Sequence, residues 1–162
     1  MDRVKEAIFS ALASRVEDAA VLDLYAGSGS LGFEALSRGA QSVVFVESRR
    51  DAVQVIRANI ATVGLGGEAV SATVEDYLAR GADTFDLAFV DPPYEVPLPS
   101  VEAVLGLLVP RLTDEATVVL HRRSGSGVVP GIPGLTVSDQ RKYGDAAITR
   151  LTKTRFTKEA TA

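Results

Sequence analysis

The chain has 162 residues, of which 46% are hydrophobic, and this is the right size for one compact domain over residues 1–162 that buries most of its apolar side chains. It contains no cysteine, which excludes disulfides, thiolate zinc sites and a cysteine nucleophile. Because it has no run of about 18 apolar residues and no signal-peptide core, we expect neither a membrane span nor secretion. We further expect a cytoplasmic protein, which the absence of cysteine favours, that is a monomer and has no metal partner.

Charge is unevenly distributed along the chain, although the formal net charge is only −4. Residues 1–121 carry 9 Lys+Arg against 18 Asp+Glu, whereas residues 122–162 carry 8 against 3. Phosphate binding depends on clustered Lys and Arg, so a nucleic-acid contact is expected in the C-terminal part. Charge alone favours a solvated basic tail, and a nucleic-acid footprint requires other observations.

Helix-like and strand-like segments alternate from the N-terminus. Apolar residues at helical spacing predict helices, and short apolar runs bounded by turn residues predict strands. In chain order the prediction is helix 2–12, strand 20–24, helix 31–38, strand 42–46, helix 49–63, strand 68–73, helix 74–80, strand 85–90, helix 100–108 and strand 117–120. This alternation implies an α/β fold with parallel β-α-β crossovers, a sheet covered on both faces and ligands at the carboxyl ends of the strands.

The alternation stops after residue 120. Residues 125–134 are rich in Gly and Pro and predict a loop. Residues 135–140 and 146–153 predict two strands, joined by a turn around Tyr143-Gly144-Asp145. We therefore expect an antiparallel hairpin at the C-terminal end of the domain.

A glycine-rich loop lies between the first predicted strand and the helix that follows it. Gly27, Gly29 and Gly32 match the pattern G-x-G-x-x-G, in which glycines let backbone N–H groups approach a ligand closely. Glu47 lies at the end of the second strand, about 20 residues further on, where a carboxylate can accept hydrogen bonds from both ribose hydroxyls. The two features together predict a nucleoside ligand.

Asp23 distinguishes between two nucleoside ligands, NAD and S-adenosylmethionine. It ends the first strand, beside the position that a dinucleotide pyrophosphate would occupy. Two like charges a few Å apart cost several kcal/mol at an effective dielectric constant near 20. The α-ammonium and sulfonium of S-adenosylmethionine would instead be attracted, so we expect this cofactor. The alternative is that Asp23 only caps the loop or the helix.

The sequence Asp91-Pro92-Pro93-Tyr94 follows the strand at 85–90, at the edge where the ligand is expected. An exocyclic base nitrogen is a poor nucleophile because its lone pair is delocalised into the ring. Two acceptors that take hydrogen bonds from its N–H groups would make it more tetrahedral and more nucleophilic. Asp91 and the Pro92 carbonyl can be those acceptors, because consecutive prolines fix the backbone. Tyr94 offers a flat face for an extruded base. The alternative is an ordinary turn at the end of a strand.

Residues 23–40, together with residues 2–9, Glu47, Asn59 and residues 91–94, resemble the bacterial 16S rRNA guanine-N2 methyltransferases of the RsmD type. The resemblance covers nearly the whole chain. It implies a class I, Rossmann-like methyltransferase fold with a mostly parallel seven-stranded sheet. It also implies S-adenosylmethionine as methyl donor, a guanine as acceptor, and 16S rRNA or an assembly intermediate of the small ribosomal subunit as partner.

The resemblance also assigns roles to single residues. It places Asp23, Gly27 and Gly29 at the methionine part of the cofactor, Glu47 at the ribose and Val74 or Asp76 at the adenine, with Tyr25 as a further cofactor-binding residue. It places Asp91 at both cofactor and base, and Pro92, Pro93 and Tyr94 at the target base. The family pattern begins with a basic, glycine-containing RNA-binding segment ahead of the first helix. This chain starts almost at that helix, so we expect the segment to be absent.

The basic C-terminal part is expected to supply three or four phosphate contacts at once. They are sought among Arg122, Arg123, Arg141, Lys142, Arg150, Lys153 and Arg155. His121, the only histidine, is interpreted as structural. Three other functions are kept as alternatives: an amino-methyltransferase for adenine N6 of DNA or another RNA, a dinucleotide-binding oxidoreductase, and a non-catalytic scaffold that binds the cofactor or RNA.

Overall fold

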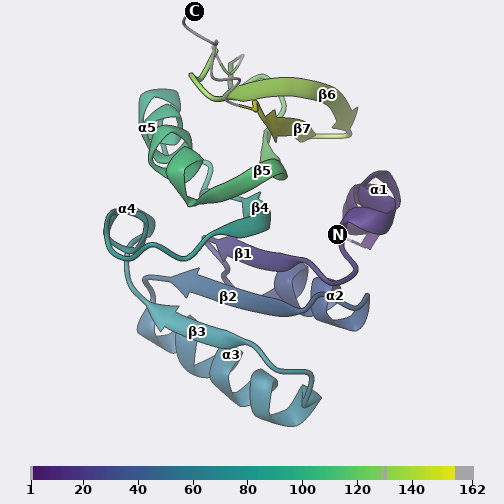
Figure 1. Cartoon of the computed structure of the whole chain (residues 1–162), viewed down its shortest axis with the longest axis vertical. Helices are drawn as coiled ribbons and strands as arrows, with labels where there is room; N and C mark the ends of the chain where they lie inside the picture. The colour runs from purple at the N-terminus through teal and green to yellow at the C-terminus, as the bar shows by residue number, and fades with distance from the viewer. Residues whose placement is uncertain (1, 128, 130, 156–162) are drawn as a thin grey trace, which may run out of the picture.

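The computed structural model describes residues 2–127, 129 and 131–155. Its helices and strands alternate as predicted up to the last parallel strand, and a hairpin follows (Figure 1). The elements are α1 (Asp2–Leu12), η1 (Ala13–Arg15), β1 (Ala20–Leu24), α2 (Ser30–Ser37), β2 (Ser42–Glu47), α3 (Arg50–Val63), β3 (Glu68–Ser71), α4 (Val74–Ala79), β4 (Phe85–Val90), α5 (Leu98–Leu108), η2 (Val109–Arg111), β5 (Leu112–Arg123), β6 (Leu135–Tyr143) and β7 (Ala146–Lys153).

One seven-stranded sheet forms the middle of the molecule, in the order β3-β2-β1-β4-β5-β7-β6. β1 to β5 run parallel to one another, and β7 lies antiparallel between β5 and β6. The predicted α/β class and the predicted C-terminal hairpin are therefore confirmed, as is the seven-stranded sheet that the resemblance implied. The predicted loop at 125–134 contains no helix or strand in its described residues; positions 128 and 130 lie outside them.

The structure corrects several predicted boundaries: β3 ends at 71 rather than 73, β5 at 123 rather than 120 and β6 at 143 rather than 140, and β5 and α5 begin earlier than predicted. β5 begins at Leu112 rather than at 117, because Leu112 pairs with Phe85 ahead of an irregularity in the β4–β5 ladder, where Glu115 has a φ of 66°. The polar residues of that irregular stretch hide the strand in the sequence. α5 begins at Leu98 rather than at 100, because Pro99 stands in the first helical turn, where its missing N–H breaks no hydrogen bond.

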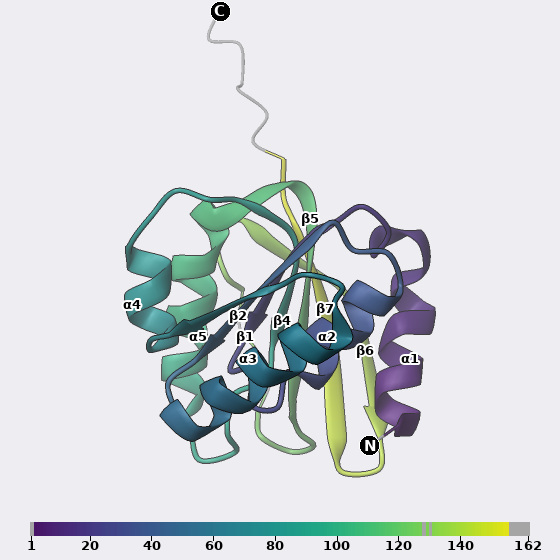
Figure 2. The ribbon, with the colours of Figure 1, turned by 90° about the horizontal axis from the view of Figure 1, so that it is seen from below.

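The sheet separates two apolar cores. Figure 2 shows α4 and α5 on one side of the sheet and α1, α2 and α3 on the other. Successive side chains of a strand alternate between these sides: Ala88 and Val90 pack in the α4–α5 core, and Leu87 and Phe89 in the other. Because both faces are covered, such strands are apolar throughout. Polar groups that serve a ligand must then lie at the strand ends.

The strand register brings four such ends into one row. Leu24 at the end of β1 is level with Val46 on one side and with Val90 on the other, and Val90 is level with Leu120. The residues that follow these positions, Tyr25, Glu47, Asp91 and His121, therefore lie on neighbouring strands at the same edge of the sheet. This edge includes β1 and β4, where the strand order reverses and where open α/β sheets bind ligands.

Candidate active site

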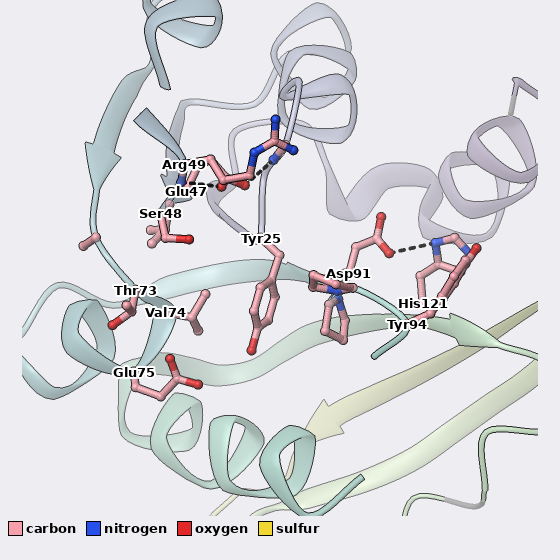
Figure 3. A pocket seen from close by; sticks show the side chains of 15 residues that line it. Tyr25, Glu47, Ser48, Arg49, Thr73, Val74, Glu75, Asp91, Tyr94 and His121 are labelled. Atoms are coloured by element: carbon pink, nitrogen blue, oxygen red, sulfur yellow. Dashed lines mark hydrogen bonds and ion pairs between the residues drawn. The ribbon is translucent and has the colours of Figure 1, made fainter. Parts of the chain in front are cut away.

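Two adjoining cavities open at the carboxyl edge of the sheet. The Glu47 cavity, of about 490 Å³, is shown in Figure 3 and is lined by Tyr25, Gly27, Val46, Glu47, Ser48, Arg49, Ala72, Thr73, Val74, Glu75, Asp91, Pro92, Pro93, Tyr94 and His121. The Asp23 cavity, of about 400 Å³, is lined by Val4, Lys5, Ile8, Asp23, Tyr25, Ala26, Gly27, Ser28, Ser30, Leu31, Asp91 and His121. Because four residues border both cavities, one long ligand can occupy the two together.

Glu47 lies where the sequence predicted it, at the end of β2. Both of its carboxylate oxygens accept backbone hydrogen bonds, Oε1 from Gly27 N–H at 2.9 Å and Oε2 from Arg49 N–H at 2.8 Å. These bonds fix the carboxylate between the glycine loop and the start of α3 (Figure 3). Each oxygen has a second lone pair, so the group can still accept hydrogen bonds from two neighbouring hydroxyls of a ligand.

Asp23 is 2% exposed and borders the Asp23 cavity. Its Oδ2 accepts a hydrogen bond from Gly32 N–H at 3.1 Å, so it does cap the first turn of α2, as the alternative interpretation held. Burial raises the pKa of this carboxyl well above its usual value, and the charges of Asp91 and Glu47 raise it further. A cationic ligand group would remove that penalty, so the capping role and a ligand role are compatible.

Lys5, which the sequence patterns did not single out, lies on α1 and lines the Asp23 cavity. Its Nζ is 3.5 Å from Ser30 Oγ, next to the glycine loop. The lining of this cavity therefore includes both a carboxylate and an ammonium group. No pattern in the sequence connects α1 with a loop some 20 residues further on, so only the packing of α1 against the sheet reveals Lys5.

The glycine loop begins with Tyr25, which has a φ of 56° in the left-handed region that non-glycine residues rarely adopt. Its ring stands between Val74 and Asp91 in Figure 3, and burial followed by the charge of Glu75 raises the pKa of its hydroxyl to about 12. Gly27 borders both cavities. Gly29 is outside the residues that line them; it has a φ of 82° and precedes α2, so its role is to shape the loop.

The structure distinguishes between the two residues predicted at the adenine. Val74 is buried and lines the Glu47 cavity, and Thr73 and Glu75 line it too. Asp76 is exposed and is absent from that lining; its N–H donates to Thr73 Oγ1 at 3.1 Å, which caps α4. The lining of the Glu47 cavity thus includes Val74 and not Asp76, because residues two apart in a helix point in different directions.

The segment from Asp91 to Tyr94 forms one wall of the Glu47 cavity. Asp91 Oδ1 is 3.1 Å from His121 Nδ1, and the Asp91 side chain is 35% exposed. Tyr94 is 60% exposed, and the Arg123 guanidinium carbon lies 6.0 Å from its ring centroid. An exposed aromatic ring beside a guanidinium group, next to a carboxylate at a cavity mouth, is suited to hold a flat, polar ligand such as a base.

Arg122, one of the predicted phosphate contacts, has hydrogen-bond partners within the fold. Its side chain is buried, and it donates to Ser126 O at 3.1 Å and to Val96 O at 3.1 Å. Arg150 donates to Ala11 O at 3.0 Å and so joins β7 to the end of α1, and Lys153 donates to Leu112 O. These three cations are occupied in joining parts of the fold.

The remaining cations are at the surface. Arg155 lies 3.4 Å from Glu115, and Arg141 lies 3.0 Å from Asp139. Arg123, Arg141 and Lys142 are exposed and line a third cavity, of about 480 Å³, between the end of β5 and the hairpin. Arg122 lines the same cavity but is buried, so of the predicted set Arg123, Arg141 and Lys142 are the exposed cations in its lining.

Two kinds of feature are absent from the described part of the chain. Within residues 2–127, 129 and 131–155, no His, Asp and Glu side chains gather in groups of three or more suited to hold a metal ion. In the same ranges, no helix combines the length and the apolar character needed to cross a bilayer.

Comparison with known proteins identifies relatives of the whole domain. The profile of the family described as "Conserved hypothetical protein 95" matches residues 1–152. Ribosomal RNA small subunit methyltransferase D of Escherichia coli K12 is 36% identical over 135 residues, which are 82% of this chain and 67% of that protein. The protein of the same name from Haemophilus influenzae is 37% identical over 112 residues, 66% of this chain and 57% of that protein.

Solved structures agree with these relatives. The putative methyltransferase yhhF from E. coli superposes with a TM-score of 0.89 at 31% identity, over 96% of this chain and 88% of that chain. SMU.776, a putative methyltransferase complexed with SAH, superposes with a TM-score of 0.76 at 13% identity, over 93% and 48%, which shows the shared class I fold alone. The chain therefore belongs to the Conserved hypothetical protein 95 family, that of the RsmD-type ribosomal RNA small subunit methyltransferases.

Proposed function

We propose that this protein is an S-adenosylmethionine-dependent methyltransferase that methylates the exocyclic N2 amino group of a guanine in 16S rRNA. One observation carries the proposal: Asp91, at the head of the Asp-Pro-Pro-Tyr segment, borders both cavities. A group in this place can touch a donor that extends through the cavities and an acceptor that enters beside Tyr94. The names of the relatives support ribosomal RNA as the acceptor.

The two cavities fit the two ends of S-adenosylmethionine. The Glu47 cavity offers Val74 to the adenine and Glu47 to the ribose hydroxyls. The lining of the Asp23 cavity includes two opposite charges, which match a zwitterionic amino acid: Asp23 for the ammonium and Lys5 for the carboxylate. When bound, the cofactor supplies a sulfonium methyl group that a nucleophile can attack.

The residues of the Asp-Pro-Pro-Tyr segment prepare the acceptor. Asp91 and the Pro92 carbonyl accept hydrogen bonds from the two N–H groups of the amino group, which makes its nitrogen more nucleophilic. Tyr94 stacks on the base. Asp91 need not be a strong base, because a methylated cationic nitrogen loses its proton to water or to a carboxylate of ordinary pKa. Arg123, Arg141 and Lys142 are proposed to hold the RNA backbone beside this segment.

The test is methyl transfer from labelled S-adenosylmethionine to 16S rRNA and to small ribosomal subunits from cells that lack the gene, followed by mapping of the modified nucleotide. We expect one N2-methylated guanine. A methylated adenine N6 would support the amino-methyltransferase alternative. Cofactor binding without transfer to either substrate would support the scaffold, and tighter binding of NAD than of S-adenosylhomocysteine would support the oxidoreductase.

A further inference from the structure

His121 is a buried polar residue that the reaction described above does not use. It is 4% exposed, lies near the end of β5 and borders both cavities. Its Nδ1 is 3.1 Å from Asp91 Oδ1, within hydrogen-bonding distance (Figure 3). The strand register explains the contact: Val90 of β4 is paired with Leu120 of β5, Asp91 follows Val90, and His121 follows Leu120.

The chemistry of the two groups fixes the direction of this hydrogen bond. An ionised carboxylate has no proton to give, so His121 Nδ1 carries the hydrogen and donates it to Asp91. The other ring nitrogen, Nε2, is buried and has no hydrogen-bond partner among the described residues. Within that part of the structure, the Asp91 carboxylate is therefore the polar partner that accounts for an imidazole at this position.

Asp91 is a carboxylate that needs to be oriented. It follows the end of β4 and precedes two prolines, and it carries its charge near Asp23, whose pKa it raises. Figure 3 shows one Asp91 oxygen directed at the imidazole and the other directed away from it. When one oxygen is held, rotation of the carboxylate is restricted and the second oxygen is fixed.

We propose that His121 is a positioning residue that holds Asp91 Oδ1 through its Nδ1–H, so that the second carboxylate oxygen is directed at the amino group to be methylated. The inference rests on the proposed function, because it assigns Asp91 to the acceptor base. His121 itself needs no contact with the substrate, the cofactor or the reacting atoms. Its one task is to present an N–H at the position of Nδ1.

Three substitutions separate positioning from packing. His121→Asn keeps an N–H donor at the distance of Nδ1 from the backbone, His121→Gln moves the donor one carbon further out, and His121→Phe keeps a ring without a donor. We expect the single-turnover rate to fall at least about tenfold in the Phe and Gln variants and less than about threefold in the Asn variant. Affinity for S-adenosylhomocysteine and the Tm, measured on the same samples, should not follow this order.

A second measurement does not depend on activity. Because the chain has one histidine, ¹⁵N-histidine labelling gives a single pair of ring-nitrogen signals. We expect the neutral ring to carry its proton on Nδ1 in the parent protein, and to shift toward the Nε2-protonated form usual for free imidazole in Asp91→Ala. An Nε2-protonated ring in the parent protein would overturn the inference.

The two measurements distinguish failure of this inference from failure of the proposed function. If the parent transfers methyl groups and His121→Phe matches its rate, the function stands and positioning is refuted. Equal losses in all three variants, accompanied by a lower Tm, would mean that His121 is structural. If the parent transfers nothing to RNA although Nδ1 is protonated and responds to Asp91→Ala, the proposed function fails and the orientation of Asp91 by His121 stands.

Discussion

The parallel strands and the C-terminal hairpin differ in where their charged side chains go. In the parallel part, Asp23 and Glu47 are buried at strand ends beside cavities, where a ligand can reach them. In the C-terminal part, Arg122, Arg150 and Lys153 donate to backbone carbonyls of other elements. These carboxylates thus border a space that a ligand can enter, whereas these three cations connect parts of the fold.

This difference shows how a charge should be interpreted. A basic stretch of sequence predicts a polyanion site only for those cations that the fold leaves at the surface, and here these include Arg123, Arg141 and Lys142. A buried carboxylate at a cavity wall carries a desolvation cost that a ligand can relieve, so it marks a binding site more directly. The two parts of the molecule can be tested separately by the substitutions below, in decreasing order of expected effect.

The largest effect is expected at Asp91. Asp91→Ala should lower turnover at least about a hundredfold, because its hydrogen bond to the amino group strengthens as the nitrogen becomes tetrahedral. Affinity for S-adenosylhomocysteine should change much less. Single-turnover assays on small ribosomal subunits and calorimetry measure the two quantities. Glu95→Ala, which removes an exposed carboxylate next to Tyr94, is the matched control. A full rate in Asp91→Ala would make the Asp-Pro-Pro-Tyr segment structural.

Glu47→Ala should weaken the binding of S-adenosylhomocysteine by about 1.5–3 kcal/mol, the scale of hydrogen bonds to a charged group. Calorimetry gives this value directly. Glu68→Ala, at an exposed position on the edge strand β3, should leave the affinity unchanged. Unchanged affinity in the Glu47 variant would exclude this carboxylate from the nucleoside site.

The hairpin is tested by the pair Arg141→Ala/Lys142→Ala. If both residues contact phosphate, RNA affinity should fall, and the slope of log affinity against log salt should become shallower by roughly 1.4–1.8. Filter binding over a range of salt concentrations measures the slope. The control Arg50→Ala/Arg57→Ala removes two exposed arginines of α3 and should not change it. If the hairpin variant has the same slope as the parent protein, Arg141 and Lys142 belong to a solvated surface that does not contact RNA.

Lys5 is tested by comparing two ligands. Lys5→Met keeps the length of the side chain and removes its charge, so binding of S-adenosylhomocysteine should weaken about fivefold, or about 1 kcal/mol. Binding of 5′-methylthioadenosine, which lacks the amino-acid part, should not change. Calorimetry with both ligands decides the matter. An equal loss for the two ligands would mean that Lys5 supports the cavity as a whole rather than the carboxylate.

The smallest effect concerns stability and pH. Because burial raises the pKa of Asp23 above its usual value of 3.8, the protonated carboxyl favours folding at low pH, and this contribution is lost as pH rises through the folded pKa. Asp23→Asn keeps an acceptor for Gly32 N–H, so it should raise the Tm of the ligand-free protein by about 2–4 °C at neutral pH.

Below pH 3.8 the same substitution should give no such gain, because the carboxyl is then protonated in both the folded and the unfolded chain. Calorimetric scans at both pH values measure the difference. The control Asp114→Asn, at an exposed position, should change the Tm by the same small amount at both pH values. A gain at both pH values, or at neither, would show that burial of the Asp23 charge does not limit stability.

Local sequence patterns were sufficient to predict the fold class and the carboxylates of the site. Asp23, Glu47 and Asp91 each end or follow a strongly apolar run, and such runs can only be buried parallel strands in a chain that alternates helices and strands. The carboxyl ends of parallel strands meet at one edge, so the order of the strands and helices alone places these three residues together, although they are far apart in the chain.

The place of Lys5, the contact of His121 and the use of the cations depend instead on tertiary packing. Lys5 reaches the cavity because α1 packs against the sheet near the glycine loop. The helix and the loop are too far apart in the sequence for a local pattern to reveal this contact. His121 meets Asp91 because β4 and β5 are neighbours in one particular register. Arg122 and Arg123 are adjacent in sequence, yet one is buried and the other exposed, because successive residues of a strand face opposite sides of the sheet.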